Sequence, residues 1–278
     1  MAESSPQSPL LSQKGLPVEI DGVFNVRSFG GYPSNLKPNC FTRDGILYRS
    51  GHLKDIASQG IKQIRDLGIS TIIDLTNSGE AKALFRGTSS LSQCRVLNFP
   101  LAKHGFSVQQ LADKYKRYLE EGEKAIAEGY LKLLIEGDQV IRDILFLIRD
   151  SPNDILLIHC AMGKDRTGVV FAVLLSLAGV SDDAIADEYS RSELALRAAL
   201  PEIAAAIKKA MPTVTDAEAL GRAKVVIQTR REAMLLMLQM MVERFGGMVP
   251  YLRNCCGIGE QDIELLQDLL TITIKGTE

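Results

Sequence analysis

The sequence predicts an α/β protein with a central, mostly parallel sheet flanked by helices and with a helical C-terminal part. Short β-branched and apolar runs alternate with helical patterns up to about residue 180. Within this part, residues 155–168 read as an apolar strand that leads through a tight loop directly into an apolar helix. After Ser181 the apolar pattern has helical spacing throughout. Strands that alternate with helices are typical of a parallel sheet on which further helices pack.

The N-terminal elements are expected to be short. Residues 1–16 are rich in Ser, Pro and Gln and are predicted to form a disordered tail, and residues 17–278 a single domain. Between residues 17 and 48, apolar pieces separated by Gly, Pro and Asp predict strands and loops at a sheet edge. The helical face of residues 56–67 ends at Gly68, a residue typical of helix C-termini.

The following elements supply the core of the predicted sheet. Residues 69–75 and 95–99 are predicted to be buried parallel strands, and residues 155–159 another strand. Three glycines divide the helical zone 108–149 into two or three helices. Ser181 is a predicted helix cap, because two aspartates in the first turn follow it.

Composition excludes several classes of function. The 278 residues contain 46% apolar and 24% charged residues and carry a formal charge of -2, so no basic field is available for nucleic acid. No apolar run reaches the ~18 residues of a membrane span, and no secretory leader is recognisable, so no stable membrane insertion is expected. Five cysteines without a C-x-x-C pair predict free thiols in a reducing compartment, the cytoplasm, and no zinc site.

The loop between His159 and Gly168 carries the predicted chemistry. Amides at a helix N-terminus, together with those of a loop folded over it, form a site for a dianionic phosphate. Gly163 and Gly168 allow the backbone to turn and to approach the ligand closely. The residues expected to bind the substrate phosphate are Ala161, Met162, Gly163, Lys164, Thr167 and Gly168.

Cys160 and Arg166 are the predicted reactive pair of this loop. Cys160 ends a strand in front of the helix N-terminus, where the thiolate is favoured and can act as a nucleophile. Arg166 can grip two phosphate oxygens with its planar guanidinium, which lysine cannot reproduce. Thr167 can donate a hydrogen bond to the Cys160 sulfur and ease its departure. This chemistry requires no metal and no cofactor.

The motif C-x5-R-[ST] preceded by His resembles the signature of the cysteine-dependent protein tyrosine phosphatase superfamily. The fuller form H-C-x-x-G-K-D-R-T-G resembles its atypical tyrosine and phosphoinositide phosphatases of bacteria and fungi, whose other motifs are similar to residues 25–31, 47–51, 73–75 and 251–257. The resemblance implies a phosphatase-type fold and hydrolysis of phosphotyrosine, phosphoserine or phosphothreonine, or phosphoinositide monoesters through a phosphocysteine. The partners are therefore phosphorylated proteins or phosphoinositides.

The sequence departs from this family at two positions. Thr76 stands where the family usually has Arg, and Ser28 follows Arg27 where the family has Asp. Both changes are expected to weaken an ion pair that supports the loop, without affecting the chemistry itself.

The general acid has several candidates. In relatives with Lys-Asp inside the loop the Asp is the candidate, which implies Asp165 here; it could instead form a salt bridge to a neighbouring cation of the loop. Asp113 and His104 are the alternatives. His159 and Asp74 are assigned supporting roles, His159 by ordering the loop and Asp74 as a turn or cap residue.

A different class of function remains open beside catalysis, namely a catalytically inactive phosphate-binding module that recruits phosphoproteins. The intact Cys160, Asp165 and Arg166 argue against it, because binding alone needs no thiolate.

Residues 191–221 are predicted to form a helical lid. The segment is Ala-rich, is interrupted by prolines and can restart at a Thr215-x-x-Glu218 capping box. Its apolar faces are modest for a core helix pair, so the segment is expected to cover the site; a plain helical layer is the alternative. Lys164 would add a second cation to the pocket, which favours substrates with further phosphates.

Overall fold

The computed structural model describes residue 15 and residues 17–77, 79, 91–102 and 108–274. The predicted tail, apart from Gly15, and His104 lie outside the described residues. The strands are β1 (Arg27–Ser28), β2 (Pro33–Ser34), β3 (Cys40–Thr42), β4 (Leu47–Ser50), β5 (Ile69–Asp74), β6 (Arg95–Asn98), β7 (Ile155–His159) and β8 (Thr271–Thr273). The helices are α1 (Ser58–Asp66), α3 (Val108–Glu121), α4 (Glu123–Glu136), α5 (Asp138–Asp150), α6 (Asp165–Leu177), α7 (Asp182–Ala195), the short 3-10 helix η3 (Arg197–Ala199), α8 (Leu200–Ala210), α9 (Asp216–Ile227), α10 (Arg231–Phe245), α11 (Met248–Asn254) and α12 (Glu260–Leu270).

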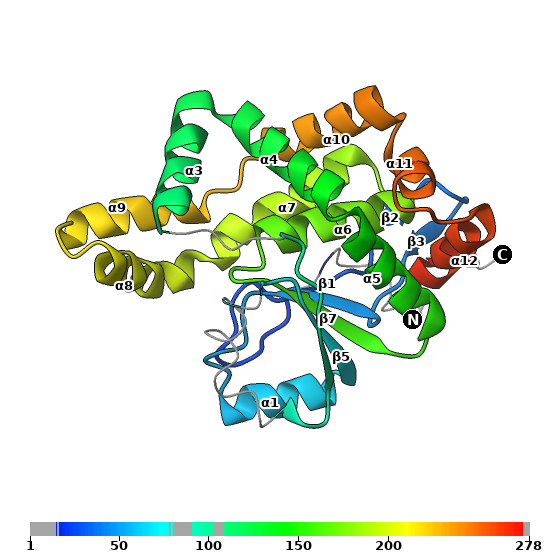
Figure 1. The fold of residues 1–278 in the computed structure, drawn as a ribbon. Coiled ribbons are helices and arrows are strands. Elements are labelled where there is room, and N and C mark those ends of the chain that lie inside the picture. Colours follow the sequence, from blue (N-terminus) through cyan, green and yellow to red (C-terminus); the bar gives the residue numbers. More distant parts are fainter. Residues whose placement is uncertain (1–14, 16, 78, 80–90, 103–107, 275–278) are drawn as a thin grey trace, which may run out of the picture.

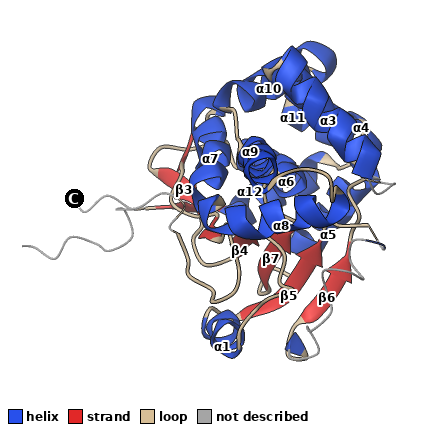
Figure 2. Cartoon of the chain, turned by 90° about the vertical axis from the view of Figure 1, so that its left-hand side faces the viewer, coloured by secondary structure: helices blue, strands red, loops and turns tan. Residues whose placement is uncertain are grey.

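The central sheet has five strands in the order β1-β4-β7-β5-β6, and all its neighbours are parallel except β1 and β4. This confirms the predicted α/β class with a mostly parallel sheet. Helix α1 lies below the sheet and the other helices gather above it (Figure 2). Strand β5 packs on both faces of the sheet. Ile69 and Ile72 belong to the apolar cluster between the sheet and α1, whereas Ile73 belongs to the main core on the other face.

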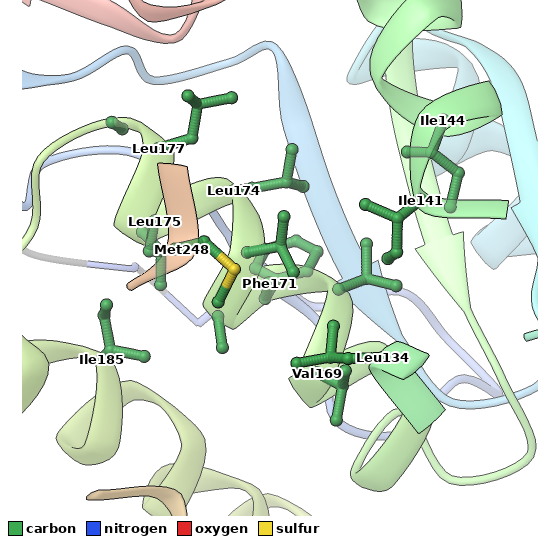
Figure 3. Close-up of a cluster of buried hydrophobic side chains, with 14 of the residues drawn as sticks. Leu134, Ile141, Ile144, Val169, Phe171, Leu174, Leu175, Leu177, Ile185 and Met248 are labelled. Atoms are coloured by element: carbon green, nitrogen blue, oxygen red, sulfur yellow. The ribbon is translucent and has the colours of Figure 1, made fainter. Parts of the chain in front are cut away.

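Helix α6 forms the centre of the main core. From Val169 to Leu175 every side chain is buried, and residues of α4, α5, α7 and α11 surround it (Figure 3). A helix that is apolar all round is stable only when other elements cover each of its sides. The apolar run that follows the loop therefore anchors the N-terminus of α6 rigidly behind the predicted site.

Several boundaries follow the sequence signals. The zone 108–149 divides into three helices at Gly122 and Gly137, while Gly129 lies inside α4. Helix α1 ends before Gly68, whose φ is +71°. Ser181 caps α7 by accepting a hydrogen bond from the Ala184 amide.

Three expectations about strands were wrong. Strand β4 is not at the edge, because it lies between β1 and β7. Strand β6 is parallel but forms the exposed edge, where Val96 keeps 43% of its surface. The C-terminal part is not entirely helical, since β8 pairs antiparallel with β3 in a second sheet, β2-β3-β8. That partner lies far away in sequence, so only the tertiary fold defines the strand.

Helices α8 and α9 form a pair that projects from the body of the molecule (Figure 1). Residues 191–195, which the sequence assigned to the lid, complete α7, and α9 continues to Ile227. Pro201 lies in the first turn of α8, and Thr215 and Glu218 form the predicted capping box at the start of α9. In the described part of the chain, no helix has the length and apolar character needed to cross a membrane.

Candidate active site

The phosphate loop, residues 160–164, connects the end of β7 to the start of α6. Because β7 lies between β4 and β5, the loop emerges from the middle of the sheet at the carboxyl ends of its parallel strands, where α/β folds place their ligands. The Gly168 amide donates to the Lys164 carbonyl at 2.9 Å as the first helical hydrogen bond. Amides before it lack a partner within the helix and are available to an anion.

Gly163 allows the loop to close tightly. Its φ is +65°, and a Cβ atom at this position would lie 2.2 Å from the Ser50 carbonyl oxygen. The loop backbone therefore passes directly against the end of β4. Only glycine fits both the left-handed conformation and this close approach.

Cys160, Arg166 and Thr167 lie together around the start of α6. The Cys160 side chain is buried, and Arg166 is the second residue of the helix and is half-buried. Thr167 Oγ1 is buried and has no hydrogen-bond partner among the described residues, so the predicted bond to the Cys160 sulfur is not formed. The hydroxyl hydrogen can rotate, so Thr167 remains available to donate to a thiolate.

His159 and Asp74, the two residues with predicted supporting roles, lie at the ends of β7 and β5. The ring of His159 is fully buried, with Nδ1 3.3 Å from the Cys160 carbonyl oxygen and Nε2 4.0 Å from Asp74 Oδ1. Burial lowers the pKa of His159 and favours the neutral imidazole. Asp74 Oδ1 accepts hydrogen bonds from the Thr76 amide and hydroxyl at 2.9 and 2.7 Å, so Asp74 is a turn residue at the end of β5.

Asp165 lies in a cluster of cations and tyrosines. Tyr130 donates a 2.5 Å hydrogen bond to its Oδ1 and is itself 2.7 Å from the Tyr189 hydroxyl. The Nζ atoms of Lys114 and Lys164 are 3.5 and 3.7 Å from the carboxylate. Burial opposes ionisation of Asp165, but these two cations and the Tyr130 hydrogen bond outweigh it, and its pKa lies well below the usual range. The salt bridge to Lys164 that the sequence offered as an alternative role is thus present.

The Lys164 ammonium does not point to the centre of the loop. It donates to the carbonyl oxygens of Val226 at 2.6 Å and Gln228 at 3.1 Å, at the end of α9. Burial lowers the pKa of Lys164. The cation that the sequence assigned to phosphate binding thus joins the phosphate loop to the α8–α9 pair in this structure.

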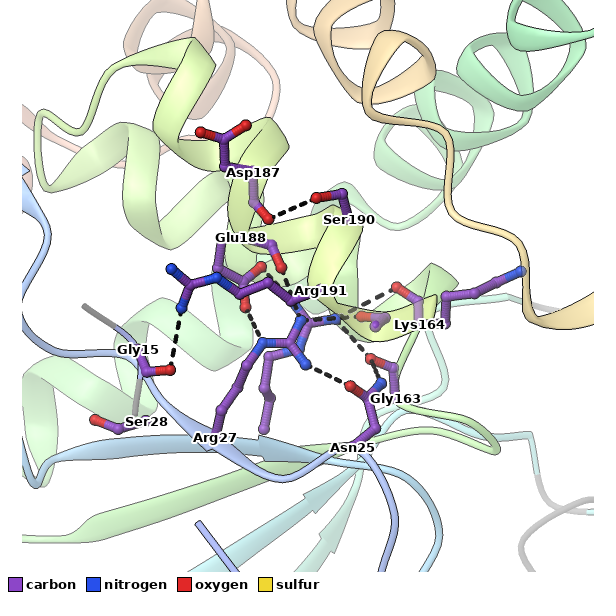
Figure 4. A network of polar contacts seen from close by, with 12 residues as sticks. Gly15, Asn25, Arg27, Ser28, Gly163, Lys164, Asp187, Glu188, Ser190 and Arg191 are labelled. Atoms are coloured by element: carbon purple, nitrogen blue, oxygen red, sulfur yellow. Dashed lines mark hydrogen bonds and ion pairs between the residues drawn. The ribbon is translucent and has the colours of Figure 1, made fainter. Parts of the chain in front are cut away.

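A buried polar network between the central sheet and α7 contacts the loop (Figure 4). Glu188 of α7 accepts a 2.7 Å hydrogen bond from Arg27 Nε and a 2.6 Å hydrogen bond from Arg49 Nη1. Arg49 Nη2 also donates to the Gly163 carbonyl at 2.6 Å, and Asn25 Nδ2 donates to the carbonyls of Met162 and Gly163 at 3.0 Å each. All of these side chains are buried.

Glu188 was missed by the sequence analysis. Its signal is a carboxylate on the buried face of α7, with Ile185 three residues before it and Ser192 four residues after it. Ser28, where the resemblance implied Asp, donates instead to Asp44. The expectation of a weakened ion pair was wrong for Arg27, because Glu188 supplies the carboxylate from a distant helix.

The other candidates for the general acid are an exposed residue and a residue outside the description. Asp113 is exposed on α3, and His104 is not described. Among the described residues, His52, Asp55 and Glu202 bring three possible ligand atoms within 4.8 Å of one another and could offer a metal site. Two of them are exposed carboxylates, which are common without a metal, so the trio by itself indicates no bound ion.

A buried cysteine in front of a helix N-terminus, an arginine in the first turn of that helix and loop carbonyls turned outward define a cysteine-dependent phosphatase, a phosphoric monoester hydrolase. Comparison with known proteins agrees with this class. The family model of the tyrosine phosphatase family matches residues 18–272, and the chain therefore belongs to this family.

Two similar proteins carry phosphatase names, and one solved structure is similar in part. The triple specificity protein phosphatase PtpB of Mycobacterium tuberculosis is 26% identical over 91% of this chain and 98% of its own. The inositol diphosphatase DSP2 of Arabidopsis thaliana is 35% identical over 27% of this chain and 28% of its own. The crystal structure of P. aeruginosa TpbA has a TM-score of 0.33 at 15% identity and covers 74% of this chain and 96% of its own.

Proposed function

We propose that this phosphatase hydrolyses phosphotyrosine and phosphoserine or phosphothreonine in proteins, and phosphoinositide monoesters, through a phosphocysteine intermediate on Cys160. The observation that carries the proposal is the buried Cys160 at the start of a loop in which the carbonyls of Met162 and Gly163 are held outward. The names of PtpB, a triple specificity phosphatase, and of DSP2, an inositol diphosphatase, support a site that accepts more than one class of monoester.

The reaction proceeds in two displacements. The Cys160 thiolate attacks phosphorus, the S–P bond forms, and the bond to the leaving oxygen breaks as that oxygen takes a proton from Asp165. The Asp165 carboxylate then removes a proton from water, the water oxygen attacks phosphorus, and the S–P bond breaks to restore the thiolate. Loop amides and Arg166 stabilise the charge on the equatorial oxygens in both steps, and Thr167 can donate to the departing sulfur.

Asp165 must hold a proton to act as the acid, although its cationic neighbours favour the carboxylate in the free protein. A dianionic phosphate bound beside it adds negative charge and raises its affinity for a proton. Tyr130 remains protonated, because burial raises its pKa well above the usual range, and so it holds Asp165 by a donated hydrogen bond. Asp165 is therefore an acid that substrate binding prepares.

The α8–α9 pair is assigned the role of a lid that shapes access. No residue of α8 is buried, and Met162 of the phosphate loop packs against a small apolar cluster that includes Ile227 and Leu200. Glu202 of α8 lies 3.5 Å from His52. Together with the hydrogen bonds from Lys164 to the end of α9, these contacts hold the pair over the loop. An opened pair would release Lys164 for a further phosphate group of the substrate.

We assign the protein to the cytoplasm. All five cysteines are free thiols, and a reducing compartment keeps both these thiols and a catalytic cysteine active.

Phosphate release from a panel of phosphopeptides and phosphoinositides tests the proposal. The wild-type protein and Cys160→Ser are compared side by side, with p-nitrophenyl phosphate as a small reference substrate. The wild type should release phosphate from both classes, and Cys160→Ser should release none while it still binds inorganic phosphate. Turnover by a folded Cys160→Ser protein would refute the mechanism, and turnover of one class alone would restrict the substrate.

A further inference from the structure

We propose that Glu188 is a positioning residue of the phosphate site: through Arg27 and Arg49 it sets the direction of two peptide groups of the phosphate loop. The inference rests on the proposed function of this loop. It assigns a role in phosphate binding to a helix that contributes no residue to the C-x5-R motif.

The first step concerns the two peptide groups after Met162 and Gly163. Their carbonyl oxygens accept from Asn25 Nδ2 at 3.0 Å each, and the Gly163 oxygen also accepts from Arg49 Nη2 at 2.6 Å. In a trans peptide the C=O and the following N–H point in opposite directions. Carbonyls held toward the network therefore turn the amides of Gly163 and Lys164 away from it, into the loop where the phosphate binds.

The second step links the donors to Glu188. Its two carboxylate oxygens are divided between the arginines, with Oε1 accepting from Arg27 Nε and Oε2 from Arg49 Nη1. Its backbone carbonyl also accepts from Arg27 Nη2 at 3.0 Å. Arg27 Nη1 donates to Asn25 Oδ1, which turns the Asn25 amide nitrogen toward the loop. Both routes to the loop thus begin at one carboxylate.

The third step is that the negative charge of Glu188, and not only the shape of its side chain, is needed to hold the two arginines. Arg27 and Arg49 keep only 3% and 0% of their surface, and a buried cation requires a partner of opposite charge. Glu188 is the carboxylate to which both are paired. Without this negative charge the two guanidinium groups repel each other without compensation. Arg49 can then no longer donate hydrogen bonds to Glu188 and to the Gly163 carbonyl at the same time.

Glu188→Gln removes this charge and nearly preserves the shape. The measurement is the dissociation constant of inorganic phosphate, together with kcat and KM for p-nitrophenyl phosphate, on protein shown to be folded by its thermal transition. We expect phosphate to bind about tenfold to a hundredfold more weakly and kcat to fall by a similar factor, the size typical of misplacement in a site. Asp187→Asn is the matched control, because Asp187 is exposed on the same helix and pairs with Arg231; its values should stay within about twofold of wild type.

A purely structural role would lower the thermal midpoint and leave phosphate affinity unchanged. A folded Glu188→Gln protein with wild-type phosphate affinity and kcat therefore overturns the proposal. Should Glu188→Gln not fold, Arg49→Lys carries the test, since its ammonium retains the charge but lacks the fork that reaches both Glu188 and Gly163. Wild-type phosphate affinity in Arg49→Lys would overturn the proposal equally. A wild-type protein that binds phosphate without hydrolysing any ester would instead refute the proposed function, and the affinity ratios would still test Glu188.

Discussion

Gly163→Ala gives the sharpest test of the loop geometry. An alanine at φ +65° costs about 1–2 kcal/mol relative to glycine. Its Cβ would lie 2.2 Å from the Ser50 oxygen, whereas real Cβ contacts are not shorter than 3.0 Å, so the loop must move by at least 0.8 Å, the difference of the two distances. Such a forced backbone shift adds about 1–3 kcal/mol. The total destabilisation of about 2–5 kcal/mol lowers the thermal midpoint by roughly 4–20 °C.

Gly163→Ala should reduce the catalytic rate more severely than the stability, because the shift of the loop displaces the amides that bind phosphate. A misplacement of about 1 Å lowers the rate roughly a hundredfold. Gly45→Ala is the matched control, since Gly45 has φ +74° but no atom within 4 Å of an added Cβ. It should lose only the conformational part, about 1–2 kcal/mol, with full turnover of p-nitrophenyl phosphate. Equal thermal midpoints and equal kcat/KM values for the two variants would refute the close approach of the loop to β4.

Three further predictions concern the charged groups around the loop. Asp165→Asn should slow alkyl phosphates by about 10²–10⁴-fold and p-nitrophenyl phosphate far less, because a good leaving group needs no proton; equal losses in both rates would make Asp165 a support of the loop. Lys164→Met should weaken the hydrolysis of multiply phosphorylated phosphoinositides about tenfold more than that of phosphotyrosine peptides, given roughly 1.5–3 kcal/mol for a hydrogen bond to a charge; a uniform loss would remove Lys164 from specificity. Burial disfavours the charged form of Glu188, but Arg27 and Arg49 outweigh this effect and lower its pKa. The cationic neighbours of Asp165 lower the pKa of that carboxyl group in the same way. The stability that both carboxylates contribute is complete above their unfolded pKa of about 4 and is lost as the pH falls through their lower folded pKa values. The thermal midpoint of the wild type should therefore drop steeply below about pH 4. A Glu188→Gln protein whose midpoint depends on acid pH as the wild type's does would contradict this.

The parts predicted from the sequence are those whose signals are local. The loop that starts at Cys160 combines a strand end, Gly163 and a helix start, and the structure places these as expected. Gly168, which the sequence assigned to phosphate binding, instead lies inside α6, where its amide donates to the Lys164 carbonyl. Ser181 and the Thr215–Glu218 box are equally local and were also confirmed. A cap or a tight turn needs only its own neighbours, so short patterns are sufficient to identify it.

The parts that were missed depend on tertiary contacts. Glu188 is separated from Arg27 by 161 positions and from Arg49 by 139, and no pattern in α7 indicates which charges it meets. Strand β8 exists only because β3 is present to pair with it. The direction of the Lys164 side chain depends on the end of α9, which folds back over the loop. Non-local pairings of this kind are defined by the whole fold, and a single sequence does not reveal them.

The central claim is that Cys160 carries the phosphoryl group during turnover, and rapid quenching tests it most directly. The wild-type protein is mixed with p-nitrophenyl phosphate, quenched in acid within the first turnover and digested, and the peptide that contains Cys160 is analysed by mass spectrometry. A phosphate on the Cys160 sulfur that forms as fast as the burst of p-nitrophenol, and that is absent in Cys160→Ser, is the predicted result. Turnover without that adduct, or with the phosphate on another residue, would contradict the account.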